Sequence, residues 1–392
     1  MLVSTDQIQR ALADDSLDGW LLYDFHGSNS IAQEIVGPRG IVTRRWYAWI
    51  PASGEPVFIH HRMENHQFAH LNGDKRDYLS WKEQDDVLKT TISGAKRIAM
   101  EYSPGNAIPY VAKVDAGLIE KLRGWDKEIV SSADLIAQFL ARWTEEQVAS
   151  HHRACKHLGE IKDNAFKLIA EAIRDGKSLN EFDVVTWIRR EFDRRGLMTH
   201  SGPICAVDAN AGSPHYEPTA EKSAPIGPDQ VVLLDIWARE KADNMVFADI
   251  TWMGYTGTEI PDKVRKVFEI VANARDSAIA FANKTLASGK DVHGYEIDDV
   301  ARKVISDAGY GDKFIHRTGH SIGTDVHGVG PNIDNLETQD QRRLQDGMCF
   351  SIEPGIYLDD FGIRLEVDVL IQNNKAVVTT LPLQTELVRV VS

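Results

Sequence analysis

The sequence predicts an α/β (α+β) protein of two domains, a small one at residues 1–143 and a larger one at residues 144–392. Three observations support this prediction. The chain has 392 residues, more than the roughly 250 to 300 at which one hydrophobic core stops growing. Short strand-like segments alternate with polar helical segments in its N-terminal part. Its remainder contains an internal repeat, which is typical of a domain built from two similar halves.

Three apolar segments in the N-terminal part have the length and composition of strands. They read GWLLYD at 19–24, RIAME at 97–101 and EIVSS at 128–132. Polar segments with helical periodicity separate them, and no catalytic signature accompanies them. We therefore expect a small α/β domain here.

A long helix is expected after Thr144, where the sequence TEEQ forms a capping box. In this motif the Thr hydroxyl accepts a hydrogen bond from a free backbone N–H, and the side chain of Gln147 reaches back to the cap. Apolar residues continue at helical spacing from Val148 to Ile173, and Gly176 is typical of a helix C-terminus. We place the domain boundary just before Thr144.

Two segments of the C-terminal part share one pattern, a Gly-Lys turn followed by an amphipathic helix and a closing glycine. The first covers residues 173–197 and the second residues 285–310. Gly176 and Gly289 are 113 positions apart, as are Gly196 and Gly309. The pattern predicts two helix-helix-strand units of equal length, related by an internal pseudo-twofold repeat.

Composition excludes several classes of partner. The net charge of −14 opposes binding to nucleic acid or anionic lipid, since both depend on clustered Lys and Arg. No long apolar run predicts a membrane span, and the first twenty residues lack the basic and apolar regions of a secretory signal. The 3 cysteines match neither a disulfide framework nor a CxxC metal motif. We expect a cytoplasmic protein without nucleic acid or membrane partners.

Two pairs of carboxylates lie within strand-like apolar segments. Asp235 and Asp249 belong to the first repeat unit, and Glu353 and Glu366 follow them by 118 and 117 positions. A carboxylate in apolar surroundings has to be neutralised, hydrogen-bonded or bound to a metal. Because the pair of carboxylates recurs in the second repeat unit, a shared site explains these four residues better than isolated positions in turns or at strand ends.

One imidazole is expected to join these four carboxylates. The sequence HRTGHSIGTDVHG at 316–328 holds three histidines, each of which taken alone is an ordinary surface or core residue. Four carboxylates and one imidazole suit two divalent cations, which share bridging carboxylates and generate hydroxide from water near neutral pH. Such an oxygen-rich set favours Mn²⁺, Co²⁺ or Zn²⁺ over copper or iron-sulfur chemistry.

The chain from residue 144 to residue 392 resembles the pita-bread metallopeptidases, the group of methionine aminopeptidase, aminopeptidase P and prolidase. The motifs that carry the resemblance are NAGSPHYEP at 210–218, LLD at 233–235, ADIT at 248–251, GH and DVHG within 319–328, SIEPGIY at 351–357 and GIRLEVDV at 362–369. The N-terminal part is similar to the creatinase-prolidase partner domain. By this resemblance the ligands of two divalent ions, with Mn²⁺ as first choice, are Asp235, Asp249, His320, Glu353 and Glu366, with Asp249 and Glu366 bridging.

The resemblance also implies roles around the ligands. His327 and His215 are expected to contact the substrate and stabilise the tetrahedral intermediate, while His316 forms part of the active-site wall. Glu353 is expected to act in catalysis as well as in ligation. Arg364 can bind the free carboxylate of a dipeptide through paired hydrogen bonds, or it can position Glu366.

The sequence departs from the family in the segment between the two aspartates. Thirteen residues separate Asp235 from Asp249, more than relatives have. We expect this enlarged hairpin to carry Trp237 and Arg239 over the site as substrate-binding residues, where they would exclude longer peptides.

The resulting prediction is a homodimeric Xaa-Pro dipeptidase of the prolidase type, acting on peptides with proline at the second position. An Xaa-Pro aminopeptidase acting on longer peptides is the alternative. A noncatalytic pita-bread scaffold is disfavoured because all five ligand positions are competent. A creatinase-like C–N hydrolase shares the two-domain plan but does not use this metal set.

Overall fold

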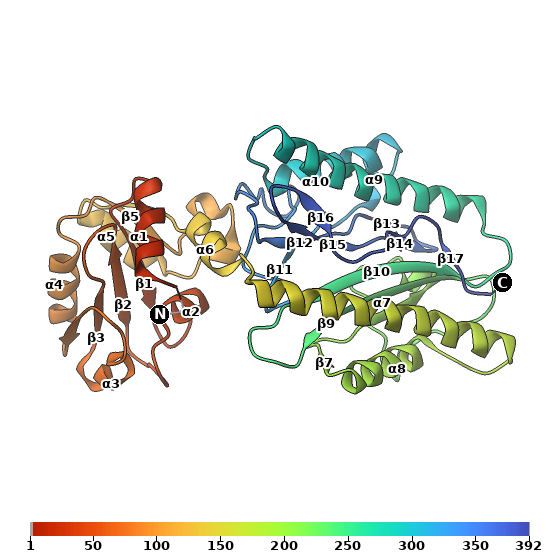
Figure 1. Ribbon diagram of the computed structural model, residues 1–392, viewed down its shortest axis with the longest axis horizontal. Coiled ribbons are helices and arrows are strands. Elements are labelled where there is room, and N and C mark those ends of the chain that lie inside the picture. The colour runs from red at the N-terminus through yellow and green to blue at the C-terminus, as the bar shows by residue number, and fades with distance from the viewer. Residues whose placement is uncertain (1–2, 392) are drawn as a thin grey trace. The chain divides into compact units, whose positions relative to one another are not determined.

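The computed structural model describes residues 3–391, which form two compact units (Figure 1), one up to Phe139 and one from Leu140. The boundary that the sequence predicts, before Thr144, lies four residues after the start of the second unit. Helices and strands occur in both units, so the predicted α/β class is confirmed.

The first unit is built on one six-stranded sheet with the order β4-β3-β2-β1-β5-β6. Strand β1 pairs antiparallel with β2 and parallel with β5, so the sheet is mixed. All three strand-like segments read from the sequence are strands of this sheet. The strands are β1 (Gly19–Asp24), β2 (Trp46–Pro51), β3 (Val57–His61), β4 (Asp74–Tyr78), β5 (Arg97–Met100) and β6 (Glu128–Ser131).

Short helices accompany this sheet, several with side-chain caps. Ser80 caps α4 through a capping box with Glu83, and Asp115 caps α5 by accepting from the N–H of Leu118. The helices are α1 (Thr5–Asp14), α2 (Ser30–Val36), α3 (Asn65–Phe68), α4 (Trp81–Thr91), α5 (Ala116–Gly124) and α6 (Ala133–Leu140), with 3-10 turns at η1 (Arg62–Glu64), η2 (Pro104–Asn106) and η3 (Pro109–Val111).

The second unit contains two sheets that meet at one backbone bridge. In the first sheet β9 pairs with β7, β8 and β10, and β17 extends the edge beyond β10. The second has the order β11-β12-β15-β16, and β13 and β14 form a separate hairpin. A bridge between Thr251 and Glu366 joins the two sheets. The strands are β7 (Leu197–Met198), β8 (Ile204–Val207), β9 (Val231–Glu240), β10 (Ala248–Tyr255), β11 (Ser321–Ile322), β12 (Cys349–Ile352), β13 (Gly355–Tyr357), β14 (Gly362–Arg364), β15 (Val367–Ile371), β16 (Ala376–Val378) and β17 (Val388–Arg389).

Four helices flank these strands as two similar pairs. Helix α7 lies along β9 and β10, and α9 packs on the strands of the other half (Figure 1). The second helix of each pair has 14 residues. The helices are α7 (Glu145–Arg174), α8 (Glu181–Arg194), α9 (Asp262–Ala287) and α10 (Gly294–Asp307), with 3-10 turns at η4 (Asp208–Asn210) and η5 (Gly311–Lys313).

The helix termini confirm the capping box that predicted the long helix and the glycines that marked the repeat. The N–H of Gln147 donates to the Thr144 hydroxyl over 3.2 Å, and the N–H of Thr144 donates to Gln147 Oε1 over 2.9 Å. One glycine follows each of the four helices in the left-handed conformation that glycine adopts without strain. These φ values are 64° for Gly176, 70° for Gly196, 73° for Gly289 and 88° for Gly309.

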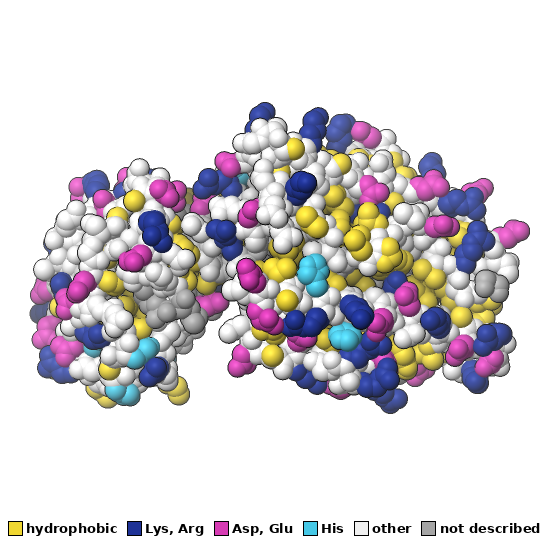
Figure 2. Space-filling model, viewed as in Figure 1, with side chains coloured by type: hydrophobic (Ala, Val, Ile, Leu, Met, Phe, Trp, Pro, Cys, Tyr) yellow, Lys and Arg dark blue, Asp and Glu magenta, His cyan; other side chains and the backbone are white. Residues whose placement is uncertain are grey.

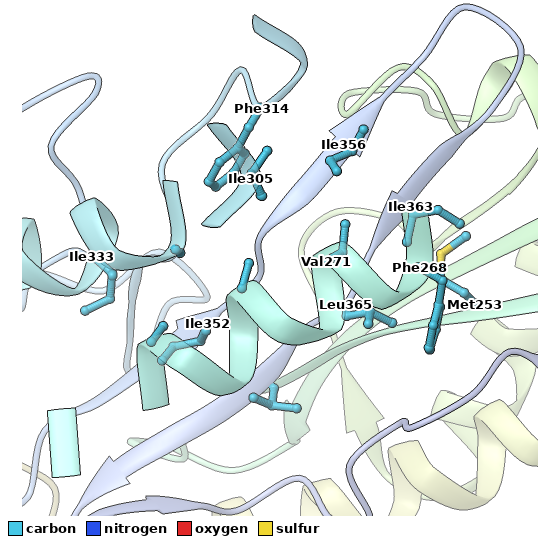
Figure 3. Close-up of a cluster of buried hydrophobic side chains, with 14 of the residues drawn as sticks. Met253, Phe268, Val271, Ile305, Phe314, Ile333, Ile352, Ile356, Ile363 and Leu365 are labelled. Carbon is cyan, nitrogen blue, oxygen red and sulfur yellow. The ribbon is translucent and has the colours of Figure 1, made fainter. Parts of the chain in front are cut away.

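The largest hydrophobic core of the second unit lies between α9 and the strands of its C-terminal half (Figure 3). Phe268 and Val271 project from α9 toward this core, where Ile352 and Ile363 are buried. A second core fills the space between α7, α8, β9 and β10. The strands are therefore held from both sides, which is the support that a precisely positioned site requires.

Lys and Arg side chains intermingle with Asp and Glu on the face of the molecule shown in Figure 2. Among residues 3–391, no helix combines the length and apolar character needed to cross a bilayer. The cysteines at positions 155, 205 and 349 are all free thiols.

Candidate metal centre

Strands β9 and β10 place the two predicted aspartates on one face of their sheet. Asp235 is opposite Thr251, and Asp249 is opposite Trp237. Residues two apart on a strand point to the same side, so the carboxylates are diagonal neighbours across the antiparallel pair. The long hairpin does not separate them, because its additional residues extend the strands and the turn.

Glu366 comes to the same place from the other half of the unit. Its backbone N–H donates to the carbonyl of Thr251 over 3.2 Å, and Thr251 Oγ1 donates to its Oε2 over 2.8 Å. A residue of the first half thereby fixes both the backbone and the carboxylate of a residue from the second. The internal repeat explains this arrangement, because its two halves contribute matching strands to one centre.

His320 completes the cluster with a nitrogen that faces three carboxylates. Its Nε2 is 3.4 Å from Glu353 Oε1, 3.8 Å from Asp249 Oδ2 and 4.0 Å from Glu366 Oε1. Its Nδ1 is 3.2 Å from the carbonyl of Ser321, which can only accept, so Nδ1 carries the proton and Nε2 presents a lone pair. Burial, and then the adjacent His327, hold the pKa of His320 well below its ordinary value.

The carboxylates of this cluster are crowded and removed from water. Burial raises the pKa of Asp249 well above its usual range, and the nearby Glu366 and Asp235 raise it further. Burial also raises the pKa of Glu353 to about 7. Within residues 3–391, Asp235 Oδ1 and Asp249 Oδ1 are buried without a hydrogen-bond partner. Buried acceptors that lack donors are costly, and divalent cations would satisfy them.

The structure therefore brings together the five residues predicted as ligands, and their donor set fits divalent metal ions. Asp249, His320 and Glu366 each offer one atom within 4.8 Å of the others. Hard oxygen donors with one imidazole suit Mn²⁺, Co²⁺ or Zn²⁺. The Nδ1–H of His320 is held by a carbonyl, as is usual for a metal-bound imidazole.

Arg364 lies beside this cluster and is bonded to Asp235. Its Nη2 donates to Asp235 Oδ2 over 2.5 Å, its Nε to Thr251 Oγ1 over 3.2 Å and its Nη1 to the Tyr357 hydroxyl over 3.1 Å. The side chain is buried. Of the two roles that the sequence predicts for Arg364, these contacts favour positioning, but the carboxylate to which Arg364 bonds is that of Asp235 and not that of Glu366.

The other predicted histidines surround the cluster. His316 Nε2 is 2.7 Å from the Tyr357 hydroxyl, and burial lowers its pKa to about 3, so this ring is neutral. The ring of His327 meets that of His320 edge to face, with centroids 4.4 Å apart. Burial, then Arg317 and His215, lower the pKa of His327. His215 and His327 are more exposed than the five carboxylate and imidazole residues, as substrate contacts require.

The two hairpin residues predicted to bind substrate differ in their surroundings. Trp237 shares the sheet face of Asp235, is partly buried, and donates from Nε1 to Ser201 Oγ over 3.2 Å. The guanidinium of Arg239 donates to the carbonyls of Glu240 and Ala242 and lies over the ring of Phe247. Arg239 would have to leave these contacts to reach a substrate.

Sequence reasoning missed two hydroxyl groups that organise the centre. Thr251 bonds both Glu366 and Arg364, and Tyr357 bonds both Arg364 and His316. The position of Thr251, two residues after Asp249 on an expected strand, was a usable signal because it places the hydroxyl on the ligand face.

Comparison with known proteins gives a consistent result. The model of Peptidase_M24, metallopeptidase family M24, matches residues 153–373. The Xaa-Pro dipeptidase of Lactobacillus helveticus is 32% identical over 78% of this chain and 77% of its own length. The Xaa-Pro dipeptidase of Lactobacillus delbrueckii subsp. lactis is 35% identical over 60% of this chain, and the match spans 58% of that relative, less than two thirds of it. The crystal structure of dipeptidase PepE from Mycobacterium ulcerans has the same fold, with a TM-score of 0.73, 20% identity, and coverage of 99% of this chain and 97% of that one.

Proposed function

The chain belongs to metallopeptidase family M24, whose model matches more than half of it, and we propose that it hydrolyses Xaa-Pro dipeptides at a centre of two divalent metal ions. The observation that carries this proposal is the buried cluster of four carboxylates and one imidazole, in which Asp235 and Asp249 each keep an oxygen without a donor. Relatives that share about a third of the aligned residues are Xaa-Pro dipeptidases, which supports the substrate class.

Asp235, Asp249, His320, Glu353 and Glu366 would hold the ions, with Asp249 and Glu366 bridging them. We propose Mn²⁺ as the working metal, because four of the five residues are carboxylates, which suit Mn²⁺, and only one is an imidazole, which suits Zn²⁺. These residues would thereby give the site the chemistry that such ions supply when bound, which is activation of water near neutral pH and polarisation of a carbonyl.

The residues of the chain then have distinct tasks. Glu353 is the most exposed of the carboxylates, at 15% of its side chain against 12% or less for the others, which suits it to exchange a proton with a water or with the leaving nitrogen. His327 and His215 would donate to oxygens of the substrate, because both lie near the cluster with accessible rings. Arg364 and Tyr357 hold Asp235 and His316 in place.

A second candidate is an Xaa-Pro aminopeptidase acting on longer peptides. The observation that favours it is the bonding of Arg364 to Thr251, Tyr357 and Asp235, which engages all three nitrogens of this buried guanidinium inside the protein. The dipeptidase relatives outweigh this observation, and Trp237 at the hairpin is the remaining candidate for limiting substrate length.

We also propose a homodimer in the cytoplasm. The free thiols at 155, 205 and 349 are compatible with a reducing compartment. The proposal of a dimer rests on the resemblance of the two-domain plan to that of the pita-bread metallopeptidases. Measuring the mass of the purified protein in solution tests it.

The deciding experiment compares matched peptides on Mn²⁺-loaded enzyme. We expect cleavage of Ala-Pro and Met-Pro with higher kcat/KM than of the same sequences extended by one residue, and negligible cleavage of Ala-Ala. Equal or faster cleavage of the extended peptides would replace the dipeptidase with the aminopeptidase. Failure to cut any of these peptides after metal loading would contradict both.

A further inference from the structure

We propose that the second unit holds another metal site, formed by His151, Cys155 and Asp368, that binds one zinc-class divalent cation. The three side chains lie outside the five-residue candidate centre. His151 and Cys155 come from α7 and Asp368 from β15. The proposal rests on their own geometry and does not depend on the peptidase activity.

The spacing of the ligand atoms suits a single small cation. His151 and Cys155 are four positions apart and so project from the same side of α7. His151 Nε2 is 3.3 Å from Cys155 Sγ and 3.9 Å from Asp368 Oδ2, and one atom from each residue lies within 4.8 Å of the others. Ligand atoms around a tetrahedral Zn²⁺ are separated by about 3.3 to 3.5 Å, given bonds of about 2.0 Å to nitrogen and about 2.3 Å to sulfur. Small side-chain adjustments would bring the three ligand atoms of His151, Cys155 and Asp368 to these separations.

The imidazole of His151 is prepared for ligation. Its Nδ1 is 2.8 Å from the carbonyl of Phe247, which fixes the proton on Nδ1. Its Nε2 is 2.7 Å from the Thr379 hydroxyl and also lies near Cys155 Sγ and Asp368 Oδ2, so a bound cation would take the place of the Thr379 hydroxyl at this lone pair. Metal-bound histidines are generally held by such a bond to a carbonyl. Burial lowers the pKa of His151 to about 4, so the ring is in the neutral form that binds metals.

Asp368 adds a buried carboxylate whose two oxygens differ in their partners. The residue is 0% exposed, and its Oδ2 accepts from the N–H of Asp249 over 2.8 Å. Its Oδ1 has no hydrogen-bond partner within residues 3–391. A buried carboxylate with an unsatisfied oxygen is costly. A divalent cation bound to this carboxylate and to the thiolate of Cys155 would balance both negative charges.

A neighbouring cavity gives the site a route to solvent. Cys155 and Thr379 line a cavity of about 370 Å³ together with His152, Lys162 and Trp252. Water from this cavity would complete the coordination, since three protein ligands leave a tetrahedral ion with one open position. The combination of sulfur, nitrogen and oxygen selects Zn²⁺ or Co²⁺ over Mg²⁺, Ca²⁺ and Mn²⁺.

The test uses Co²⁺ as a spectroscopic probe on the full-length protein after removal of metals. Cobalt bound to a thiolate gives a charge-transfer band in the near ultraviolet, and the candidate centre contains no sulfur ligand. We expect this band in the wild type and its loss in Cys155→Ser, with bound Co²⁺ lower by one equivalent per chain. Cys205→Ser, which replaces a buried thiol outside this cluster, is the matched control and should keep the band.

Two further variants separate this site from other sources of the signal. Asp249→Ala removes a ligand of the candidate dinuclear centre but keeps the backbone N–H that bonds Asp368, so the band should persist. Cys349→Ser should also retain it. A wild type without the band at saturating Co²⁺ would overturn the proposal, as would an unchanged band in Cys155→Ser or a band that disappears only in Cys349→Ser. Thermal unfolding of each variant confirms that it is folded.

Discussion

Arg364 and Asp235 form a buried ion pair, with Nη2 2.5 Å from Oδ2 and side chains only 5% and 12% exposed. Burial raises the pKa of Asp235, and the charge of Arg364 with its hydrogen bond opposes that shift. The pair therefore favours the ionised form of the Asp235 carboxylate and orients its Oδ2, while Oδ1 remains without a hydrogen-bond donor. A guanidinium suits this role because it also donates to Thr251 and Tyr357 from fixed directions.

Replacing Arg364 with Met should leave Asp235 as an uncompensated buried charge. Removing one partner of a buried pair typically destabilises a protein by about 3 to 5 kcal/mol, and metal affinity should fall with stability. Arg364→Lys is the matched variant, because it keeps the positive charge but not the planar arrangement of N–H donors. With metal-loaded variants, we expect kcat to fall alike on dipeptides and on extended peptides. A rise in KM confined to dipeptides would instead show that Arg364 binds the terminal carboxylate.

Metal removal should abolish hydrolysis, and the ligands should differ in their effects. Glu366→Ala is expected to lose both ions because Glu366 is proposed to bridge them, whereas His320→Ala should lose chiefly one. Metal analysis of the purified variants after loading with Mn²⁺ measures this. Two ions and normal turnover in Glu366→Ala would refute the assignment, as would full activity of demonstrably metal-free protein.

His327→Ala should retain both metals and lower kcat by about a hundredfold or more, because a donor directed at developing negative charge contributes on that scale. His215→Ala should act in the same direction. Steady-state kinetics with parallel metal analysis distinguish this loss from loss of ligands. An unchanged kcat in folded, metal-loaded His327→Ala would indicate a packing role for this ring.

The stability of the first unit should depend on pH through Glu101. This carboxylate is 0% exposed and accepts from Trp20 Nε1 over 2.6 Å and from Asn29 Nδ2 over 2.8 Å. Burial nevertheless raises its pKa to about 7 from an ordinary value of 4.5. The folded state therefore keeps its proton longer than the unfolded state, so the associated stability is full below pH 4.5 and is lost as pH rises to about 7.

If the full pKa shift of Glu101 is realised, the protein loses about 3 kcal/mol of folding stability across this pH range. Glu101→Gln should be less stable overall, because the amide NH₂ group would face a side-chain N–H of Trp20 or Asn29 that needs an acceptor. The stability of this variant should nevertheless change less between about pH 5 and about pH 8, because an amide does not titrate. Denaturant unfolding of both proteins across this range measures the difference. Parallel pH profiles would mean that Glu101 is ionised throughout.

The sequence alone predicted those features that local patterns encode. The capping box at Thr144, the glycines at the helix ends and the 113-residue spacing determine the helices and the repeat, because capping and left-handed turns depend on neighbouring residues. The carboxylates in apolar segments likewise marked a site, because burial of charge requires a partner wherever it occurs. The domain boundary and the ligand roles remain predictions.

Only the tertiary structure could decide which groups meet. Arg364 and Asp235 are 129 positions apart, and the choice of Asp235 over Glu366 as its partner depends on how the two sheets join at Thr251. The sequence alone does not reveal the cluster of His151, Cys155 and Asp368, because a helix and a strand far apart in the sequence contribute its side chains. The sequence gives the chemical type of each side chain, whereas long-range packing of the chain decides which side chains lie close enough to form a site.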